Sequence, residues 1–289
     1  MAHADDEIAS QPECWWRAAE LAKHVELALP HRGQRIAVVG CGTSWFVGQA
    51  YAALRERAGH GETDAFSASE FPVGRRYDRV VMITRSGTTT EVLDLLARLR
   101  GTASTTLTAV PDAPVVDLTG DAVVLDFADE ESVVQTRFAT SALSLLRAHL
   151  GTAPPSDAAS EALAEELPID PAAVGQVTFL GSGWASGLAQ EAALKCREAA
   201  GLWAEAYPAM EYRHGPIAIA QPGRAVWALG SLPNGLAGDI TRTGATLVQH
   251  DRDPLAELVL AQRFAIAAAV QRGLDPDQPR SLTRSVILR

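Results

Sequence analysis

The chain has 289 residues, enough for one large or two medium-sized domains, and its 47% hydrophobic content is typical of a folded globular protein. Its formal net charge of −10 would repel a polyphosphate backbone, so we expect no nucleic-acid partner. The three cysteines, Cys14, Cys41 and Cys196, lack a C-x-x-C spacing, which argues against a disulfide framework and a zinc cluster. No stretch reaches the roughly 18 apolar residues of a membrane span, so we expect a cytoplasmic protein without membrane contact.

Short apolar runs alternate with longer segments of helical periodicity, which is the pattern of βα units around a parallel sheet. The first series contains predicted strands or helices at 35–40, 44–59, 62–68, 79–84 and 106–110. The second contains them at 176–181, 184–201, 202–207, 224–230 and 245–250. An Ala-, Pro- and acid-rich segment at 151–173 lies between the two series. The sequence therefore predicts two α/β domains, residues 1–152 with an N-terminal helix and residues 153–289 with a C-terminal tail.

The two series match each other when residue n is compared with residue n+141. Gly40 and Gly42 then fall on Gly181 and Gly183. Seven further positions between 64 and 74 pair with similar residues between 205 and 215. The chain is therefore predicted to contain two copies of one α/β unit, with a site at the strand ends.

A hydroxyl-rich loop, RSGTTT at residues 85–90, lies between a predicted strand and a predicted helix. The free N–H groups of the helix start favour an anion, and Gly87 lets the backbone approach it closely. The loop hydroxyls can donate hydrogen bonds without adding charge; they belong to Thr84, Ser86, Thr88 and Thr89. A phosphate monoester suits this pattern, although serine and threonine often do no more than cap a helix.

A second turn, Gly40-Cys41-Gly42-Thr43-Ser44, repeats the order strand, glycine, hydroxyl, helix and is expected at the same sheet edge. Two such turns in one half favour a ligand site over simple helix capping. Neither turn is a GxxxxGK[ST] loop or a complete GxGxxG pattern, so a small phosphate is favoured over a nucleotide.

Four segments resemble the sugar isomerase (SIS) family, in particular the tandem isomerase half of glucosamine-6-phosphate synthase. They are VVGCGTS, ITRSGTTTEVL, FLGSGWASGLAQEAALKCREAAGLWAEAYPAMEYRHGP and DPDQPRSLTRSV. The resemblance implies a flavodoxin-like parallel sheet in each half, a sugar phosphate as substrate and no metal or other cofactor. It also implies a homodimer with active sites near the subunit interface.

The resemblance assigns ligand roles to residues in and near the two turns. The implied phosphate ligands are Ser44, Thr84, Arg85, Ser86 and Thr89. The implied sugar-binding residues are Cys41, Gly42, Thr43, Val133 and Thr283. Arg85 replaces a usual glutamine and could pair with the phosphate, and Gln135 replaces a usual serine. The equivalent loop of the second half, residues 230–234, lacks the hydroxyl pattern, so we expect phosphate only in the first half.

Glu191, Lys195 and Glu198 are spaced to share one helical face. An exposed salt-bridge stripe would explain a generic spacing of this kind. The resemblance instead makes Glu198 the general base that moves a proton between C1 and C2 of an open-chain sugar phosphate. It makes His214, which would otherwise be a plain loop histidine, the ring-opening residue supplied by the neighbouring subunit.

The tail departs from the family because Arg284 stands where a lysine forms an imine with the ketose. A guanidinium cannot form that imine, so we expect non-covalent chemistry in which Arg284 acts electrostatically, with Lys195 as the rival imine-forming residue. The chain begins at the isomerase half, so we expect no glutamine-hydrolysing domain. Isomerisation or deamination of a hexose or hexosamine 6-phosphate is the favoured function. The alternatives are a fructosamine-phosphate deglycase and a non-catalytic sugar phosphate sensor.

Overall fold

A computed structural model of the chain describes residues 2–99 and 101–288, which form two compact units. The sheet A unit consists of Glu13–Glu130, Gln135–Pro154 and Thr283–Arg289. The sheet B unit consists of Met1–Pro12, Glu131–Val134 and Pro155–Leu282. Each unit therefore contains short segments from other parts of the sequence, and the C-terminal tail is part of the sheet A unit.

The sheet A unit contains a five-stranded parallel sheet of order β2-β1-β3-β4-β5, which is the flavodoxin-like order. Its strands are β1 (Ile36–Gly40), β2 (Thr63–Ser67), β3 (Arg79–Ile83), β4 (Ser104–Thr108) and β5 (Asp121–Val124). β1 and β3 are neighbours, with Ile36 opposite Arg79 and Val39 opposite Met82. The loops that follow these two strands therefore leave the sheet side by side at its carboxyl edge.

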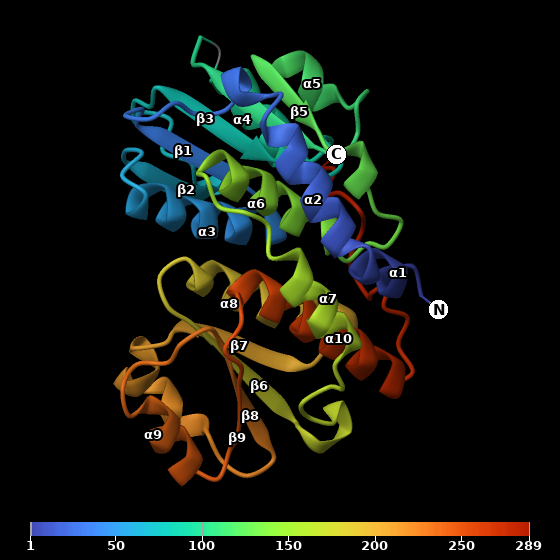
Figure 1. Cartoon of the computed structure of the whole chain (residues 1–289). Helices are drawn as coiled ribbons and strands as arrows, with labels where there is room; N and C mark the ends of the chain where they lie inside the picture. The colour runs from blue at the N-terminus through green and yellow to red at the C-terminus, as the bar shows by residue number, and fades with distance from the viewer. Residues whose placement is uncertain (1, 100, 289) are drawn as a thin grey trace. The chain divides into compact units, whose positions relative to one another are not determined.

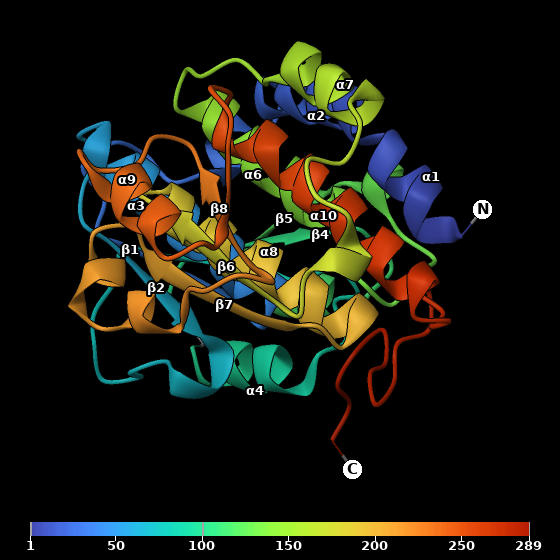
Figure 2. The same cartoon turned by 90° about the horizontal axis from the view of Figure 1, so that it is seen from below.

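Helices cover both faces of sheet A (Figures 1 and 2). The helices of this unit are α2 (Gln11–Ala22), α3 (Thr43–Arg57), α4 (Thr90–Arg98), α5 (Pro114–Leu118) and α6 (Arg137–His149). Short 3₁₀ helices occur at Glu26–Ala28, Ala68–Glu70 and Asp126–Ala128. α3 packs against α6 on one face, and α4 lies on the other (Figure 2).

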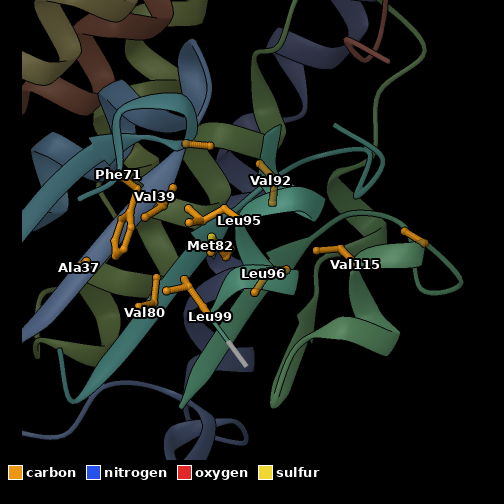
Figure 3. Close-up of a cluster of buried hydrophobic side chains, with 12 residues drawn as sticks. Ala37, Val39, Phe71, Val80, Met82, Val92, Leu95, Leu96, Leu99 and Val115 are labelled. Atoms are coloured by element: carbon orange, nitrogen blue, oxygen red, sulfur yellow. The ribbon is translucent and has the colours of Figure 1, made fainter. Parts of the chain in front are cut away.

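The core under α4 forms because alternate strand residues point to the same face. Val80 and Met82 of β3 meet Val92, Leu95 and Leu96 of α4, all of them buried. These helix residues recur at three- and four-residue intervals, which is the apolar stripe expected of an amphipathic helix. Figure 3 shows this cluster extending from Ala37 and Phe71 on one side of the view to Val115 on the other.

The sheet B unit contains a four-stranded parallel sheet of order β7-β6-β8-β9. Its strands are β6 (Gln176–Gly181), β7 (Trp203–Pro208), β8 (Arg224–Leu229) and β9 (Thr246–Gln249). Its helices are α1 (His3–Ala9), α7 (Ser156–Ala164), α8 (Ala185–Ala200), α9 (Leu236–Arg242) and α10 (Pro254–Gln271). Short 3₁₀ helices occur at Pro171–Ala173, Glu211–His214 and Pro216–Ile219. α8 packs against α10, which also contacts α7 and α1 (Figure 1).

The strand orders confirm the predicted repeat, because β2-β1-β3-β4 and β7-β6-β8-β9 correspond strand by strand. Gly40 and Gly181, which the repeat pairs, have the same structural role in both copies. A Cβ atom on Gly40 would lie 2.6 Å from Ser44 C, and one on Gly181 would lie 2.2 Å from Ala185 O. A side chain at either position would therefore clash with the start of the following helix.

The predicted domain limits, 1–152 and 153–289, stay predictions. Residues 1 and 289, the first and last of these limits, lie outside the described part of the chain. Among the described residues, no helix is both long enough and apolar enough to cross a membrane.

Candidate active site

Two glycine-containing loops lie at the carboxyl edge of sheet A, one after β1 and one after β3. In the first loop Gly42 has φ +52°, and its carbonyl accepts hydrogen bonds from the N–H groups of Trp45 and Phe46. Thr43 and Ser44 are buried at the start of α3. The sequence prediction that both turns open on one edge of the sheet is confirmed by this topology.

The hydroxyl loop, defined as residues 84–89, is fixed to the neighbouring strand by its backbone. Thr84 N–H donates to Leu107 O at 3.0 Å, and Ala109 N–H donates to Arg85 O at 3.0 Å. Gly87 has φ +65°, and a Cβ atom there would lie 2.4 Å from Ala113 Cβ. The loop conformation therefore requires glycine at this position, on both backbone and steric grounds.

The loop hydroxyls are not used as a simple helix cap. Thr89 is the residue before α4, yet its side chain makes no capping hydrogen bond. Thr88 Oγ1 lies 3.0 Å from Ser86 Oγ instead. The alternative that Thr89 caps the helix is therefore wrong, and its hydroxyl instead lies 3.4 Å from that of Ser285.

Arg85 forms an ion pair with Glu130 inside the protein. Its Nη1 atom lies 3.2 Å from Glu130 Oε2, and the two side chains are 1% and 0% exposed. Glu130 Oε1 also accepts hydrogen bonds from Thr136 N–H at 2.5 Å, Thr136 Oγ1 at 2.9 Å and Arg137 N–H at 2.8 Å. Glu130 thus balances the Arg85 charge and accepts hydrogen bonds from the N–H groups at the start of α6.

The C-terminal tail lies on the hydroxyl loop. Ser285 Oγ is 2.9 Å from Thr88 Oγ1 and 3.4 Å from Thr89 Oγ1. Thr90 N–H, at the start of α4, donates to Val286 O at 3.1 Å, and Leu288 N–H donates to Thr90 Oγ1 at 2.9 Å. The tail therefore contributes a hydroxyl and a carbonyl at the place where the sequence predicts an anion.

Arg284 anchors this tail to the segment that pairs with Arg85. Its guanidinium donates to the Asp129 carboxylate and to the Glu130 carbonyl oxygen. Arg85 Nη2 in turn donates to Arg284 O at 3.4 Å. Asp129 and Glu130 thus hold both arginines that distinguish this chain from the family pattern.

The predicted sugar-binding residues of sheet A have different environments. Burial, reinforced by the nearby Glu91 carboxylate, raises the pKa of the Cys41 thiol, although a hydrogen bond from the Ala68 backbone opposes this shift. Cys41 is therefore a neutral thiol at pH 7 and not a nucleophilic thiolate. Thr283 is exposed, and its hydroxyl donates to Ser285 O at 2.8 Å.

The segment that the resemblance places along the sugar is divided between the two units. Val133 belongs to the sheet B unit, and its N–H donates to Asp277 O at 3.0 Å. Gln135 belongs to the sheet A unit, and its side-chain oxygen is buried without a hydrogen-bond partner among the described residues. A buried amide oxygen of this kind can accept a hydrogen bond from a ligand hydroxyl or amine.

In the sheet B unit, α8 carries the predicted Glu191, Lys195 and Glu198 on one face. Lys195 Nζ lies 2.5 Å from Glu198 Oε2 and 3.3 Å from Glu191 Oε1. The Glu191 and Lys195 side chains are each 1% exposed, whereas Glu198 is 20% exposed. The alternative of an exposed salt-bridge stripe is therefore wrong, and the carboxylate that reaches solvent is the predicted base.

His214 ends the 3₁₀ helix Glu211–His214 and is exposed. Its side chain makes no hydrogen bond or ion pair with the other described residues. Gly215, which follows it, has φ +134°, so the chain turns sharply after the histidine. The role assigned to His214 stays a prediction.

The predicted site residues therefore fall into two sets. The sheet A unit contains Cys41, Gly42, Thr43, Ser44, Thr84, Arg85, Ser86, Thr89, Thr283 and Arg284. The sheet B unit contains Val133, Lys195, Glu198 and His214. Sequence reasoning missed Glu130 and Ser285; no motif marks Glu130, whereas Ser285 lies in the segment DPDQPRSLTRSV. Within residues 2–99 and 101–288, no cluster of three His, Cys, Asp or Glu side chains could hold a metal ion.

Comparisons with known proteins identify relatives that cover most of the chain. No protein-family model matches the chain. The chain is 27% identical over 294 residues to glutamine–fructose-6-phosphate aminotransferase (isomerizing) from Sulfurisphaera tokodaii, covering 88% of this chain and 50% of the relative. It is 30% identical over 332 residues to the protein of the same name from Nostoc sp., covering 88% and 52%. The chain thus spans about half the length of the curated relatives it matches.

Solved structures match nearly the whole chain. Glucosamine-6-phosphate deaminase from Thermotoga maritima has a TM-score of 0.84 at 24% identity, covering 99% of this chain and 100% of that one. The C-terminal domain of glucosamine-fructose-6-phosphate aminotransferase from Francisella tularensis has a TM-score of 0.80 at 21% identity, covering 96% and 98%. Tagatose-6-phosphate ketose/aldose isomerase from Escherichia coli has a TM-score of 0.78 at 17% identity, covering 99% and 96%.

These matches confirm the predicted fold class, α/β with two tandem flavodoxin-like units, each a parallel sheet flanked by helices. The predicted resemblance is confirmed as well. The chain's homologues are the isomerizing glutamine–fructose-6-phosphate aminotransferases, and its structural neighbours are sugar phosphate isomerases and deaminases.

Proposed function

We propose that the protein is a sugar phosphate enzyme that isomerises or deaminates a hexose or hexosamine 6-phosphate. The observation that carries this proposal is the hydroxyl loop, whose side chains lie together at a strand end without capping the following helix. Homology to the isomerizing aminotransferases and the fold shared with a deaminase and an isomerase support the same reaction class.

The phosphate is proposed to bind the hydroxyl loop and the start of α4. Ser86, Thr88 and Thr89 offer neutral donors, and the positive end of α4 favours an anion. Arg85 was predicted as a direct phosphate ligand, but its charge is balanced by Glu130 at 3.2 Å. We therefore assign Arg85 to holding the loop and the tail in place, and the hydroxyls to recognition of the phosphate.

The chemical step is proposed for Glu198. Its carboxylate removes the proton from the carbon next to the substrate carbonyl and returns it to the former carbonyl carbon, while a proton passes from the adjacent hydroxyl or amine to the carbonyl oxygen, so that the intermediate is an enediol or an enolamine. For an amino sugar the product of this transfer is an imine, which water hydrolyses to the ketose and ammonia. Lys195 lies 2.5 Å from Glu198 and fixes the orientation of the carboxylate. In this proposal Lys195 is a positioning residue, because a nitrogen that is ion-paired with two carboxylates, Glu191 and Glu198, is a poor imine-forming amine.

His214 is proposed to help open the sugar ring, and to do so in the active site of a second subunit of a homodimer. Its exposed position at a sharp turn supports this assignment, since it is free to contact another molecule. Cytoplasmic localisation is part of the same proposal, in keeping with a soluble metabolite as substrate.

Replacing Ser86 and Thr89 by alanine should weaken binding of fructose 6-phosphate by about 1–3 kcal/mol, since each lost bond to a charged group is modest. Titration calorimetry measures this loss, with unphosphorylated fructose as the comparison ligand. Thr119→Ala, a hydroxyl removed from the amino-terminal side of β5, serves as the matched control and should leave affinity unchanged. Equal losses for the phosphorylated and unphosphorylated sugars would contradict the phosphate assignment.

The sensor alternative is favoured by one specific observation: the Arg284 guanidinium is already engaged by Asp129 and Glu130. An enzyme working without an imine should give no covalent adduct when borohydride is added with substrate, because arginine offers no neutral amine. Mass spectrometry of the treated protein checks this expectation. An adduct mapped to Lys195 would contradict the non-covalent mechanism. Binding of sugar phosphates without turnover, with chemistry restored by Arg284→Lys alone, would favour the sensor.

A further inference from the structure

A second pocket lies in the sheet A unit at the amino-terminal edge of the sheet, away from the hydroxyl loop. It has a volume of about 550 Å³, within the range of small-molecule sites. Arg35 immediately precedes β1, Val80 is near the start of β3, and Thr102 precedes β4, and all three line the pocket. A ligand bound here would therefore occupy the sheet edge opposite the proposed phosphate loop.

Four arginines, Arg35, Arg75, Arg76 and Arg98, line this pocket, together with a single carboxylate, Asp78. Only 25 of the 289 residues are basic and the chain carries a net charge of −10, so this concentration of positive charge is unusual for the molecule. A cleft lined by one sign of charge attracts ligands of the other sign. We call this feature the arginine pocket.

Two of these arginines are already balanced. Arg35 Nε lies 3.0 Å from Glu62 Oε2, and Arg75 Nη1 lies 3.7 Å from Asp64 Oδ2. The Asp64 carboxylate also accepts a hydrogen bond from Tyr77 OH at 2.7 Å. These contacts pair Arg35 and Arg75 with carboxylates. The unpaired positive charge of the pocket therefore comes from Arg76 and Arg98.

Arg76 and Arg98 have no carboxylate partner among the described residues, and both are exposed. Guanidinium groups pair with phosphate oxygens through two parallel N–H donors, which makes arginine well suited to phosphate recognition. The pocket therefore offers two unpaired cations beside a framework of fixed ones.

Apolar side chains form part of the pocket lining. Phe71, Val80 and Leu99 belong to the buried cluster under α4 and also line the pocket (Figure 3). Tyr77 adds an aromatic ring, over which the Arg35 guanidinium lies at 5.2 Å from the centroid. Phe71, Val80 and Leu99 are buried, whereas Val73 and Tyr77 are half-buried and keep apolar surface that an inorganic ion would leave unused.

We propose that the arginine pocket binds a small organic phosphate, with the phosphate on Arg76 and Arg98 and an apolar or aromatic body against the half-buried Val73 and Tyr77. This site is separate from the proposed substrate site and does not depend on the reaction proposed there. It gives the protein a second small-molecule ligand at the opposite edge of the same sheet.

Phenyl phosphate tests this proposal, because it combines a dianion with an aromatic ring. Titration calorimetry is carried out on the full chain carrying Ser86→Ala and Thr89→Ala, which weakens competition from the hydroxyl loop. We expect saturable binding of phenyl phosphate, weaker binding of inorganic phosphate and none of uncharged benzamide. Adding Arg76→Gln and Arg98→Gln should lower the affinity for phenyl phosphate by at least about tenfold, the loss expected for two charged hydrogen bonds.

Arg57→Gln is the matched control, since Arg57 is an exposed arginine of the same unit outside the pocket. It should leave the affinity unchanged. An equal loss in this control would reduce the effect to general charge attraction and overturn the proposal. Equal affinity for inorganic and phenyl phosphate, or no binding of phenyl phosphate at about 10 mM, where even a weak site of millimolar Kd would be filled, would overturn it too.

Discussion

Glu198→Gln should lower kcat for the sugar phosphate substrate by about 100- to 10,000-fold, the contribution typical of a positioned general base. The amide has nearly the shape of the carboxylate but cannot take up the proton. KM should change little, because the phosphate is proposed to be held by the hydroxyl loop and not by Glu198. Steady-state kinetics with fructose 6-phosphate and glucosamine 6-phosphate separate the two parameters.

Glu191→Gln provides the control for this result, since Glu191 is the other carboxylate that contacts Lys195. This variant alters the same buried ion-pair group but leaves the proposed base in place. An equal loss of kcat in the two variants would show that the ion pairs, and not proton transfer by Glu198, limit turnover. Mixing Glu198→Gln with His214→Ala subunits should restore part of the activity if the histidine acts in a second subunit.

Most of the fold could be predicted from local patterns in the sequence. The apolar run at 35–40 and the glycine that ends it identify β1 and the turn into α3, and the same run at 176–181 identifies β6. A parallel strand buried on both faces produces such a run directly. The exchange of short segments between the units, such as residues 131–134 and 283–289, could not be predicted, because no local pattern records which unit a connecting segment packs against.

Site residues could be predicted where their role follows from the neighbouring sequence. They could not be predicted where the role depends on a contact between segments that are distant in the sequence. Gly87 and the loop hydroxyls can be identified from the sequence, because they directly follow a predicted strand. The partner of Arg85 cannot be identified in this way, because Glu130 lies 45 residues further along the chain in a run of three acidic residues. Arg85 was therefore predicted as a direct phosphate ligand, whereas in the structure its charge is paired with Glu130.

The substitution Glu130→Gln should lower the free energy of unfolding of the sheet A unit by about 3–5 kcal/mol, the usual cost of leaving a buried charge without its partner. Glutamine keeps a side-chain oxygen for Thr136 N–H and Arg137 N–H, so the start of α6 stays satisfied. Its amide nitrogen would face the Arg85 guanidinium, and because both groups are hydrogen-bond donors they could not bond to each other. Hydrogen exchange of the β3 amides, read by mass spectrometry, measures this unit separately from the other one.

Arg85→Gln alone should cost less than Glu130→Gln, because the Glu130 carboxylate would still accept three hydrogen bonds at the α6 start. The double variant Arg85→Gln with Glu130→Gln should recover most of the loss, since two amides can hydrogen-bond each other without a buried charge. Faster exchange at residues 283–288 should accompany each variant that removes Arg85, whose side chain donates to Arg284 O. Single and double variants within about 0.5 kcal/mol of the parent protein, the range of an ordinary surface change, would contradict the buried ion pair as the anchor of loop and tail.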